Sequence, residues 1–371
     1  MKVKKKLSVL IYSMAGGGAE RVVSILVNEL YETYKIILVL MSNIIVYNLP
    51  KDIEIFYLEN SKPSENGMWK FLKLPYLGWK YKNFCSENKI DISLAFMNRP
   101  SYISIFAKFF GNRIKTIISE RSTPSQIYSG NSLQSKISRF LVAWLYPYAD
   151  LIITNSLGNK DDLIVNFGIN EEKLITIYNP FDIKKIQELS SVQVSFLDFS
   201  KFTFISVGRI VTGKNYKLLI ESFRKTLLKD AQLIIIGEGE LKGELEDIVQ
   251  RYDLQEQIFF IGFDSNPYKY MIKSDCFVFS SNYEGFPNVL VEALACELPI
   301  ISTNCKSGPD EILGDGKFGI LTTVGSEKEM IEAMKKIYTN QKLREQLHNQ
   351  ALLRAKQFNK NKIIRQYLDV L

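Results

Sequence analysis

Two basic residues lie close together in residues 208–215 (GRIVTGKN), which follow a short apolar run. Arg209 and Lys214 in one strand-to-helix loop could clamp a diphosphate, because a guanidinium binds two oxygens at once and an ammonium adds a point charge. The spacing is close to that of a P-loop, but Asn215 replaces the Ser or Thr that would hold magnesium. A P-loop-like NTPase is therefore the alternative of another class, and two exposed cations with no ligand are the alternative without function.

Two glutamates, Glu284 and Glu292, lie eight residues apart in residues 283–295 (YEGFPNVLVEALA). Pro287 favours the first turn of a helix, which places Glu284 in the preceding loop and Glu292 about one turn inside the helix. Carboxylates accept hydrogen bonds from sugar hydroxyls, and backbone N–H groups at a helix start favour phosphate. The pattern indicates a nucleotide-sugar site; solvated surface acids are the alternative, as is a sugar-binding module that catalyses nothing.

Two further glycine-rich segments follow apolar runs. Gly16, Gly17 and Gly18 precede an amphipathic segment, where glycines let the backbone approach a phosphate or sugar at a helix start. Residues 237–243 (GEGELKG) are one residue too long for the dinucleotide fingerprint G-x-G-x-x-G, and their two glutamates would repel a pyrophosphate. A tight structural turn is the alternative for the first segment, and a nicotinamide enzyme is the disfavoured alternative for the second.

Histidine and cysteine are too scarce for several common chemistries. The only histidine, His348, lies in a charged stretch, so a Ser-His-Asp triad would depend on it and histidine-based metal sites are disfavoured. The four cysteines form no Cys-x-x-Cys pair, which argues against zinc and dithiol redox sites. These counts therefore argue against histidine-based metal sites and against zinc or dithiol sites.

The candidate residues must be positioned by short apolar runs that alternate with helical patterns. Strands are expected at 7–12, 36–40, 114–118, 151–154, 204–207, 233–236, 276–280 and 300–303, and helices between most of them, such as 20–30 and 215–228. This alternation predicts βαβ units and parallel sheets. The length of 371 residues and a Pro-containing joint at 178–182 predict two doubly wound α/β domains hinged near residue 180. Ligands of such sheets bind outside the carboxyl ends of the strands, so we expect the site in a cleft between the domains.

Positive charge is concentrated in the first half of the chain. Residues 1–180 contain 22 Lys and Arg against 15 Asp and Glu, whereas the remainder contains 25 of each. Residues 69–82 (WKFLKLPYLGWKYK) interleave lysines with aromatics, which suits an anionic membrane surface; a helix that covers the first sheet with a solvated basic face is the alternative. No recognised nucleic-acid motif accompanies the charge, so we expect no nucleic-acid partner.

The amino-terminal residues also need an interpretation. Lys2 and the lysines at 4–6 precede a short apolar stretch ending at Ala15, which is similar to a secretory signal. Because this stretch runs directly into the glycine-rich segment and an amphipathic pattern, we favour a strand, a glycine loop and a helix. No apolar run approaches 18 residues, so no spanning helix is expected.

These motifs together resemble glycosyltransferase family 4, whose members are retaining enzymes with the GT-B fold. The resemblance covers nearly the whole chain: GGGAER at 16–21, VGR at 207–209, GKN at 213–215, GEG at 237–239 and the pair Glu284 and Glu292. It implies two Rossmann-like domains that face a central cleft. An acceptor-binding domain would span 1–180 and a nucleotide-sugar domain 181–358, with a C-terminal helix at 359–371 that crosses back to the first domain.

The resemblance also implies that the enzyme needs no metal and no cofactor, with a UDP-sugar as its donor substrate. It further implies roles for individual residues. Arg209, Lys214 and Glu284 would be catalytic, the two cations stabilising the leaving UDP diphosphate, and Glu292 would bind the ribose hydroxyls. Many relatives place a histidine in the first domain near the reacting carbon; this chain has none there, and Glu120 or Arg121 would serve instead, with a buried structural salt bridge as the alternative. The other expected substrate-binding residues are Gly16, Gly17, Gly18, Gly237, Phe263, Gly285, Phe286, Asn288 and Val289.

Four short stretches, at 61–66, 71–75, 97–100 and 264–270, are similar to bacterial α-1,4-N-acetylgalactosaminyltransferases. That resemblance implies transfer of N-acetylgalactosamine from UDP-GalNAc to an oligosaccharide on undecaprenyl diphosphate. The partners would be the UDP-sugar, the polyprenyl-diphosphate-linked glycan and the anionic membrane surface, and the enzyme would be cytoplasmic and peripheral on the inner face of the bacterial membrane. Another family 4 hexosyl or N-acetylhexosaminyl transferase of O-antigen or capsule synthesis is the alternative.

Overall fold

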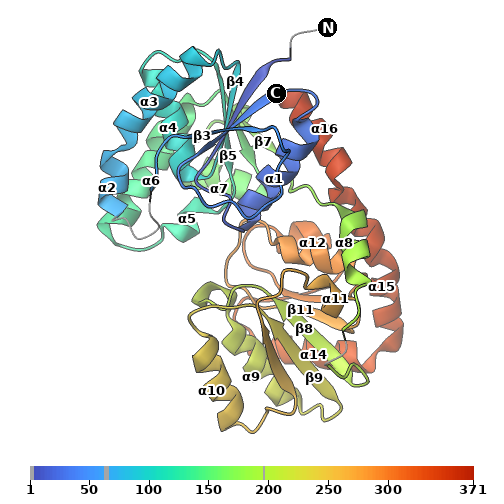
Figure 1. Ribbon diagram of the computed structural model, residues 1–371. Coiled ribbons are helices and arrows are strands. Elements are labelled where there is room, and N and C mark those ends of the chain that lie inside the picture. Colours follow the sequence, from blue (N-terminus) through green and yellow to red (C-terminus); the bar gives the residue numbers. More distant parts are fainter. Residues whose placement is uncertain (1–3, 62–66, 195–196) are drawn as a thin grey trace. The chain divides into compact units, whose positions relative to one another are not determined.

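The computed structural model describes residues 4–61, 67–194 and 197–371 (Figure 1). Lys2 and most of the stretch at 61–66 therefore lie outside the described residues. The chain divides into two compact units. The first unit contains Met1–Pro180 and Asn361–Leu371, and the second unit contains Phe181–Lys360.

The first unit is built on a parallel sheet whose strand order is β3-β2-β1-β4-β5-β6-β7. The strands are β1 (Lys6–Ile11), β2 (Lys35–Leu40), β3 (Glu54–Tyr57), β4 (Ile92–Phe96), β5 (Lys115–Glu120), β6 (Leu151–Thr154) and β7 (Leu174–Thr176). Central strands such as β4 are buried along their whole length, because helices cover both faces of the sheet.

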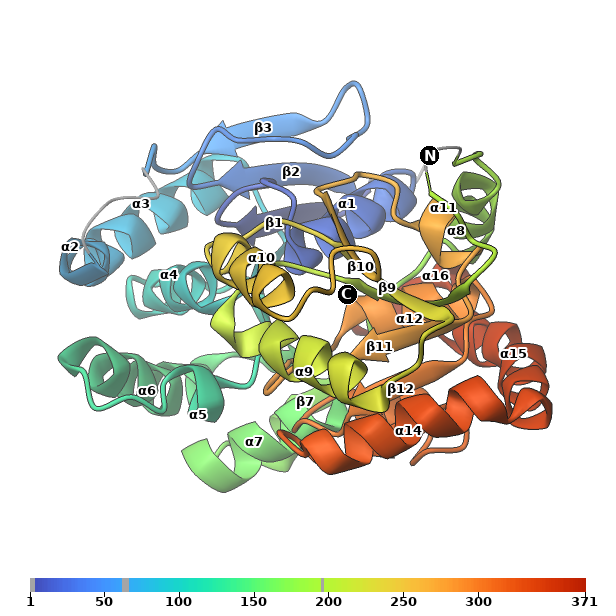
Figure 2. The same ribbon diagram turned by 90° about the horizontal axis from the view of Figure 1, so that it is seen from below.

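Helices form a layer on each face of this sheet. On one face lie α1 (Gly18–Leu30) and part of α16 (Lys360–Val370), whose Ile363, Ile364 and Tyr367 belong to one buried cluster with β1 and β2. On the other face, α3 (Leu74–Glu87), α4 (Asn98–Phe109) and α6 (Leu133–Leu145) lie side by side (Figures 1 and 2). The remaining helices of the first unit are α2 (Gly67–Leu72), α5 (Pro124–Ile127) and α7 (Leu157–Phe167).

The second unit repeats this architecture with the strand order β10-β9-β8-β11-β12-β13, again parallel. Its strands are β8 (Phe202–Val207), β9 (Ala231–Ile236), β10 (Ile258–Gly262), β11 (Cys276–Phe279), β12 (Ile300–Thr303) and β13 (Ile320–Thr322). Its helices are α8 (Ile183–Ser190), α9 (Tyr216–Thr226), α10 (Lys242–Arg251), α11 (Tyr268–Met271), α12 (Asn288–Ala295), α13 (Pro309–Leu313), α14 (Glu327–Thr339) and α15 (Gln341–Ala355). The cluster beneath α9, α10 and α14 forms one core of this unit.

The α/β prediction of two doubly wound, Rossmann-like domains is confirmed. The amino-terminal segment is a strand, a glycine loop and a helix, as favoured over a secretory signal. No helix in the described ranges combines the length and the apolarity that a membrane crossing requires. The basic stretch at 69–82 forms α2 and the first part of α3, which covers the first sheet with Leu74, Leu77 and Tyr81 turned inward.

Candidate active site

The catalytic candidates of the second unit lie where the connections of its sheet change direction. β8 and β11 are neighbours in the sheet although they are not consecutive in the chain, so the loops that follow them leave side by side. Such a switch point opens a crevice at the carboxyl ends of the strands, where ligands of doubly wound sheets bind. Residues 208–215 follow β8 and residues 280–287 follow β11, so the sheet order brings the two motifs together.

Lys214 and Glu284 contact each other directly at this point. The Lys214 ammonium forms a salt bridge with Oε1 of Glu284, and both side chains are largely buried, with 24% and 15% of their surface exposed. The Ser281 hydroxyl donates to the same carboxylate oxygen over 2.9 Å. The ammonium also lies 5.5 Å from the centroid of the Phe279 ring. Both charges are therefore held in a partly desolvated place, where their interactions with a ligand are strengthened.

Backbone bonds fix the loop that carries Lys214. The Asn282 N–H donates to the Gly213 carbonyl over 2.9 Å, and the Ser280 hydroxyl donates to the Lys214 carbonyl over 2.8 Å. Asn215 adopts a left-handed conformation (φ 48°), and its side chain caps α9 by accepting from the Leu218 N–H. The residue that departs from the P-loop pattern is thus a helix cap, a role that suits asparagine. Arg209, on the same loop, is exposed.

Glycines allow two loops to approach each other backbone to backbone. Gly237 has φ +148°, and a Cβ there would lie 1.9 Å from the Gly208 carbonyl oxygen. A Cβ at Gly239 would lie 2.1 Å from the carbonyl oxygen of Ile210. The Ile210 N–H in turn donates to the Glu238 carbonyl over 2.9 Å. These glycines are therefore required for packing the β8–α9 loop against the β9–α10 loop, whatever else they contact.

The other motif residues of the second unit lie at the start of α12 and at the end of β10. Glu292 is on α12 and only 4% exposed, and Phe286 is buried edge-on against Phe358 with ring centroids 5.7 Å apart. Gly285, Asn288 and Val289 are partly exposed around the first turn. Phe263 follows β10 and is 78% exposed. The Phe286 side chain therefore anchors this loop, which leaves its backbone as the part that can face a ligand.

In the first unit, the glycine loop follows β1 and starts α1. Gly16 has φ +109°, and Gly17 is the N-cap residue of α1, whose first turn carries no side-chain cap. All three glycines are exposed. Met97, directly after the neighbouring strand β4, has φ 70°, a conformation that is strained for a residue with a side chain. Here too the sheet changes direction between adjacent strands, β1 and β4.

Glu120 is buried in the first unit (1% exposed), where hydrogen bonds surround its carboxylate. Its carboxylate accepts from the Tyr146 hydroxyl (2.6 Å), the Asn98 amide (2.9 Å), the Ser122 hydroxyl (2.7 Å) and the backbone N–H groups of Arg121 and Ser122. Burial raises the pKa of Glu120, and these hydrogen bonds oppose the shift. The carboxylate therefore holds the end of β5 and the loop after it in place.

Arg121 points to a different set of groups. Its guanidinium donates to the Ser119 hydroxyl over 3.2 Å and to the Tyr367 hydroxyl over 3.4 Å, and it lies 5.6 Å from the centroid of the Phe96 ring. The side chain is partly exposed. Of the two residues, Arg121 is the one that a ligand can reach.

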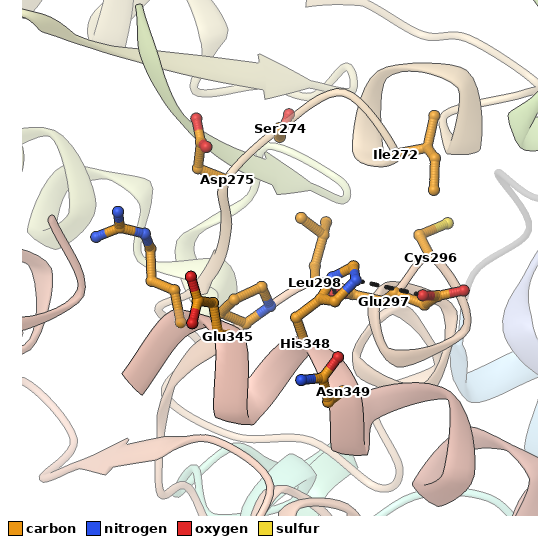
Figure 3. A pocket seen from close by; sticks show the side chains of 11 residues that line it. Ile272, Ser274, Asp275, Cys296, Glu297, Leu298, Glu345, His348 and Asn349 are labelled. Carbon is orange, nitrogen blue, oxygen red and sulfur yellow. Dashed lines mark hydrogen bonds and ion pairs between the residues drawn. The ribbon is translucent and has the colours of Figure 1, made fainter. Parts of the chain in front are cut away.

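His348 lines a pocket at the opposite, amino-terminal edge of the second sheet (Figure 3). Ser274 and Asp275 line the same pocket, but the three residues do not form a triad. His348 contacts Glu297, Asp275 accepts from the Thr203 N–H, and the Ser274 hydroxyl donates to the Tyr270 carbonyl. Among the described residues, no group of three or more His, Cys, Asp or Glu side chains is arranged to hold a metal ion.

The structure thus brings Lys214, Glu284 and the loop of Arg209 together, and it places Glu292 about one turn inside α12, the helix that follows the loop of Glu284. Glu120 and Arg121 are adjacent in the chain but have separate partners. Sequence reasoning missed Ser281, whose hydroxyl holds Glu284, and Asn98, whose amide holds Glu120. Ser281 could have been found from its place three residues before Glu284, at the end of a strand.

Two family models match this chain and divide it as the two units do. Residues 16–185 match the model described as Glycosyltransferase Family 4, and residues 191–354 match the model described as Glycosyl transferases group 1. The first match contains the glycines at 16–18, which lead from β1 into α1. The second match contains residues 208–215, which lead from β8 into α9.

The chain is also similar to characterised proteins along its full length. It is 44% identical over 367 residues, 99% of either chain, to the N-acetylgalactosamine-N,N'-diacetylbacillosaminyl-diphospho-undecaprenol 4-alpha-N-acetylgalactosaminyltransferase of Campylobacter jejuni. Its fold matches HepE of Anabaena in complex with UDP-glucose (TM-score 0.78, 20% identity, 99% of this chain and 100% of that chain). It also matches sucrose-phosphate synthase of Thermosynechococcus elongatus (TM-score 0.84, 16% identity, 99% and 98%). The chain therefore belongs to glycosyltransferase family 4 and is a glycosyltransferase with the GT-B fold.

Proposed function

We propose that this enzyme transfers N-acetylgalactosamine from UDP-GalNAc, in α-1,4 linkage and with retention, to an oligosaccharide carried on undecaprenyl diphosphate. The full-length identity of 44% to the Campylobacter jejuni transferase supports this choice of donor and acceptor. The observation that carries the chemistry is the contact between Lys214 and Glu284 at the switch point of the second sheet. A transferase of the same family with another hexosyl or N-acetylhexosaminyl donor is the rival.

In this proposal the second unit is the nucleotide-sugar domain. Arg209 and Lys214 bind the diphosphate, while Glu284 accepts hydrogen bonds from the sugar hydroxyls. Glu292 accepts from the ribose, and Phe263, which is exposed at the end of β10, borders the uracil. Backbone N–H groups of the α12 start hold phosphate and sugar oxygens, because a helix amino terminus attracts anions. The residues that supply these N–H groups are Gly285, Phe286, Asn288 and Val289. Gly237, which follows β9, lets the neighbouring loop pack closely beside the site.

The reaction breaks the bond between C1 of the sugar and the diphosphate oxygen and forms a bond between C1 and an acceptor hydroxyl, whose proton is released. Negative charge grows on the departing diphosphate. Lys214 is positioned by Glu284 before the donor arrives, so it stabilises this charge without reorganising. Retention follows either by attack on the face that the leaving group vacates or through a covalent intermediate.

The first unit is the acceptor domain in this proposal. Gly16, Gly17 and Gly18 let the α1 start approach the diphosphate and the acceptor. Arg121 supplies a positive charge near the reacting carbon, and the buried Glu120 fixes the loop that presents it. The remaining residues of the chain, after Lys360, support this unit through α16.

We further propose that UDP-sugar and lipid-linked acceptor suffice for turnover, without a metal. The cationic groups at the second switch point supply the charge that a metal would supply elsewhere, and the sequence has no Asp-x-Asp motif. The enzyme works at the cytoplasmic face of the bacterial membrane as a peripheral protein, because its acceptor is anchored there and its excess of positive charge lies in residues 1–180.

The test is to incubate the protein separately with UDP-GalNAc, UDP-GlcNAc, UDP-galactose and UDP-glucose and with a polyprenyl-diphosphate-linked glycan. Mass spectrometry and linkage analysis of the product identify the sugar and the bond. We expect transfer from UDP-GalNAc that persists in EDTA. Transfer from another UDP-sugar alone would favour the rival, and a dependence on added divalent metal would contradict the metal-free mechanism.

A further inference from the structure

All three tryptophans of the chain are exposed, and all three lie on one helix layer of the first unit. Trp69 on α2 is 62% exposed, Trp79 on α3 is 49% exposed and Trp144 on α6 is 42% exposed. Tryptophan is among the residues that bury most surface when they are covered, so three exposed indoles on one layer are unusual for a free surface. This layer is the one that covers the sheet with α3, α4 and α6 (Figure 2).

Helix α6 is apolar on both its inner and its outer side. Leu141, Val142 and Leu145 are buried against the sheet. On the outer side, Leu133 and Phe140 are 65% and 61% exposed. An ordinary surface helix is polar on the side away from the core, so the outer stripe of α6 has no purpose in the fold of this unit.

Aromatic rings continue this stripe onto α4. The Trp144 ring lies 5.8 Å from Phe140, 5.9 Å from Phe109 and 6.2 Å from Phe106, measured between ring centroids. Tyr148, just after α6, lies edge-on to Phe109 at 4.9 Å. Phe109 and Tyr148 are 43% and 48% exposed. The rings thus form one cluster across two helices and keep much of their surface in solvent.

A second stripe runs along α2 and α3. Leu72, Tyr76 and Trp79 recur at helical spacing and are 67%, 61% and 49% exposed. A close approach of α3 to α4 joins the two stripes: a Cβ at Gly78 would lie 2.4 Å from Cβ of Phe106, and Phe106 in turn contacts Trp144. We call the outer surface formed by these stripes the aromatic face; it consists of Trp69, Leu72, Tyr76, Trp79, Phe109, Leu133, Phe140, Trp144 and Tyr148.

The charges on the same helices are almost all positive. α2, α3, α4 and α6 together contain seven Lys and Arg residues and one acid, Glu87 at the end of α3. Aromatic rings mixed with cations are typical of surfaces that sit at the level of lipid headgroups, where the rings reach the acyl boundary and the cations meet anionic lipid. A protein partner would need matching acids, whereas an anionic bilayer supplies both required properties at once.

We propose that the aromatic face docks on an anionic lipid bilayer, with the indole and phenyl rings inserted to the depth of the headgroups. The proposal rests on the proposed function only in that a lipid-carried acceptor gives the enzyme a reason to stay at a bilayer. It assigns anchoring to the rings of α4 and α6 as well as to the lysines at 69–82. Attachment therefore combines apolar insertion with electrostatic attraction and persists in part at high salt.

Tryptophan fluorescence, excited at about 295 nm where tyrosine absorbs little, tests the proposal directly, because all three tryptophans of the chain lie on the aromatic face. The full-length protein is mixed with vesicles of phosphatidylglycerol and phosphatidylcholine, with and without bromine on the upper part of the acyl chains. We expect bromolipid to quench the emission, and we expect part of the binding to survive 1 M salt. Absence of quenching under conditions in which the protein sediments with vesicles would overturn the proposal.

Substitutions on the exposed stripe separate docking from folding. Phe140→Ser with Trp144→Ser is expected to lower the vesicle partition coefficient by about tenfold or more, since two large apolar side chains no longer enter the interface. Leu353→Ser on α15, where the native leucine is 66% exposed, is the matched control and is expected to bind as wild type. A double variant that binds vesicles like the control would contradict the proposal.

Two further measurements distinguish a loss of membrane docking from a loss of activity and from dimer formation. The first is transfer to a soluble acceptor with a short hydrocarbon chain, assayed without vesicles. We expect the double variant and the wild type to transfer at the same rate. If the wild type does not transfer the sugar, that result counts against the proposed function and not against docking. Sedimentation velocity is expected to show a monomer. A dimer that the two substitutions dissociate would assign the aromatic face to a second copy of the chain and would overturn the proposal.

Discussion

At the scale of residues, the site is set by contacts between side chains that the chain order keeps far apart. Lys214 and Glu284 were predicted separately, as a phosphate ligand and as a sugar ligand, from the loops that carry them. Their mutual salt bridge was not predicted, because it depends on β8 and β11 being neighbours in the sheet. Local motifs predict candidate residues one loop at a time, whereas the sheet order decides which of these residues meet.

Removing either member of this pair should impair turnover. We expect Lys214→Ala and Glu284→Ala each to lower kcat by about 10²-fold or more, on the scale of losing one group that stabilises charge in the transition state. Steady-state transfer from the UDP-sugar measures the effect, and circular dichroism checks that the fold is kept. Rates near wild type for both variants would contradict the site assignment.

Ser281 should affect the reaction through Glu284. Its hydroxyl donates to Glu284 over 2.9 Å, and its own carbonyl accepts from the Thr303 hydroxyl over 2.6 Å. We expect Ser281→Ala to lower kcat by about tenfold, the size of one hydrogen bond to a charged group. The loss should be smaller in a Glu284→Ala background, because the oxygen that accepts the Ser281 hydrogen bond is already gone.

Ser302→Ala is the control for this prediction. Ser302 is equally buried on the next strand, and its hydroxyl donates to the Thr303 carbonyl over 2.9 Å rather than to Glu284. We expect kcat of this variant to stay close to wild type. If Ser281→Ala and Ser302→Ala lower kcat equally, and by the same factor with and without the Glu284 substitution, then Ser281 acts through folding and not through Glu284.

Glu120 should make stability depend on pH. Burial raises its pKa above the ordinary value of 4.5, so the folded chain binds a proton more tightly than the unfolded chain. The stabilisation is complete below the unfolded pKa and is lost as pH rises through the raised pKa. The free energy of unfolding of wild type minus that of Glu120→Gln should therefore fall from pH 4.5 towards neutrality, as measured by urea titration.

At the scale of elements, the strands predicted from apolar runs are confirmed apart from shifts of one or two residues at their ends. The strands that were missed include β3, β7, β10 and β13, which lie at or beside the sheet edges, are short and are less completely buried. These strands form because they pair with a neighbouring strand, and the local hydrophobic pattern of the sequence does not predict that pairing. β4 was missed as well; it is a run of only five residues, Ile92–Phe96.

The glycine contact between loops gives a prediction at this scale. A Cβ at Gly237 would lie 1.9 Å from a backbone oxygen, so one of the two loops must move. We expect Gly237→Ala to lower the free energy of unfolding by about 2 kcal/mol or more, in the range of strained backbone sites. It should also weaken UDP binding, measured by calorimetry, since the loop that carries Lys214 shifts.

Gly243→Ala is the matched control, six residues further along. Gly243 lies in the first turn of α10, and nothing lies within 4 Å of the position of a Cβ there. The alanine should leave UDP binding unchanged and stabilise the helix by up to about 1 kcal/mol. Comparable losses in both variants would show that the effect does not arise from the contact between the loops.

At the scale of the whole molecule, the first unit is completed by the last residues of the chain. Tyr367 is fully buried in its core and accepts a hydrogen bond from Arg121, and the Lys115 ammonium donates to the Val370 carbonyl over 2.8 Å. We expect Tyr367→Ala to lower the free energy of unfolding of this unit by about 3–5 kcal/mol, as for other large buried rings.

Leu368→Ala, one residue further along α16, is the comparison. Its side chain is 37% exposed, so its truncation should cost less than about 1 kcal/mol. Hydrogen exchange followed by mass spectrometry localises the effect: faster exchange in β1 and α1 is expected for the tyrosine variant alone. Equal exchange in both variants would mean that α16 contributes little to this core.

Residues 361–371 return to the first unit, and this return affects how the first unit can fold during translation. In the core of the first unit, β1, β2 and α1 pack with Ile363, Ile364 and Tyr367. The ribosome synthesises more than 300 further residues after these strands and this helix before the three side chains emerge. During translation the nascent first unit therefore displays an open apolar surface, while residues 181–360 have everything that their own core needs. Chaperones that bind nascent chains should accordingly favour residues 1–180, and they should dissociate only after residues 361–371 have emerged from the ribosome.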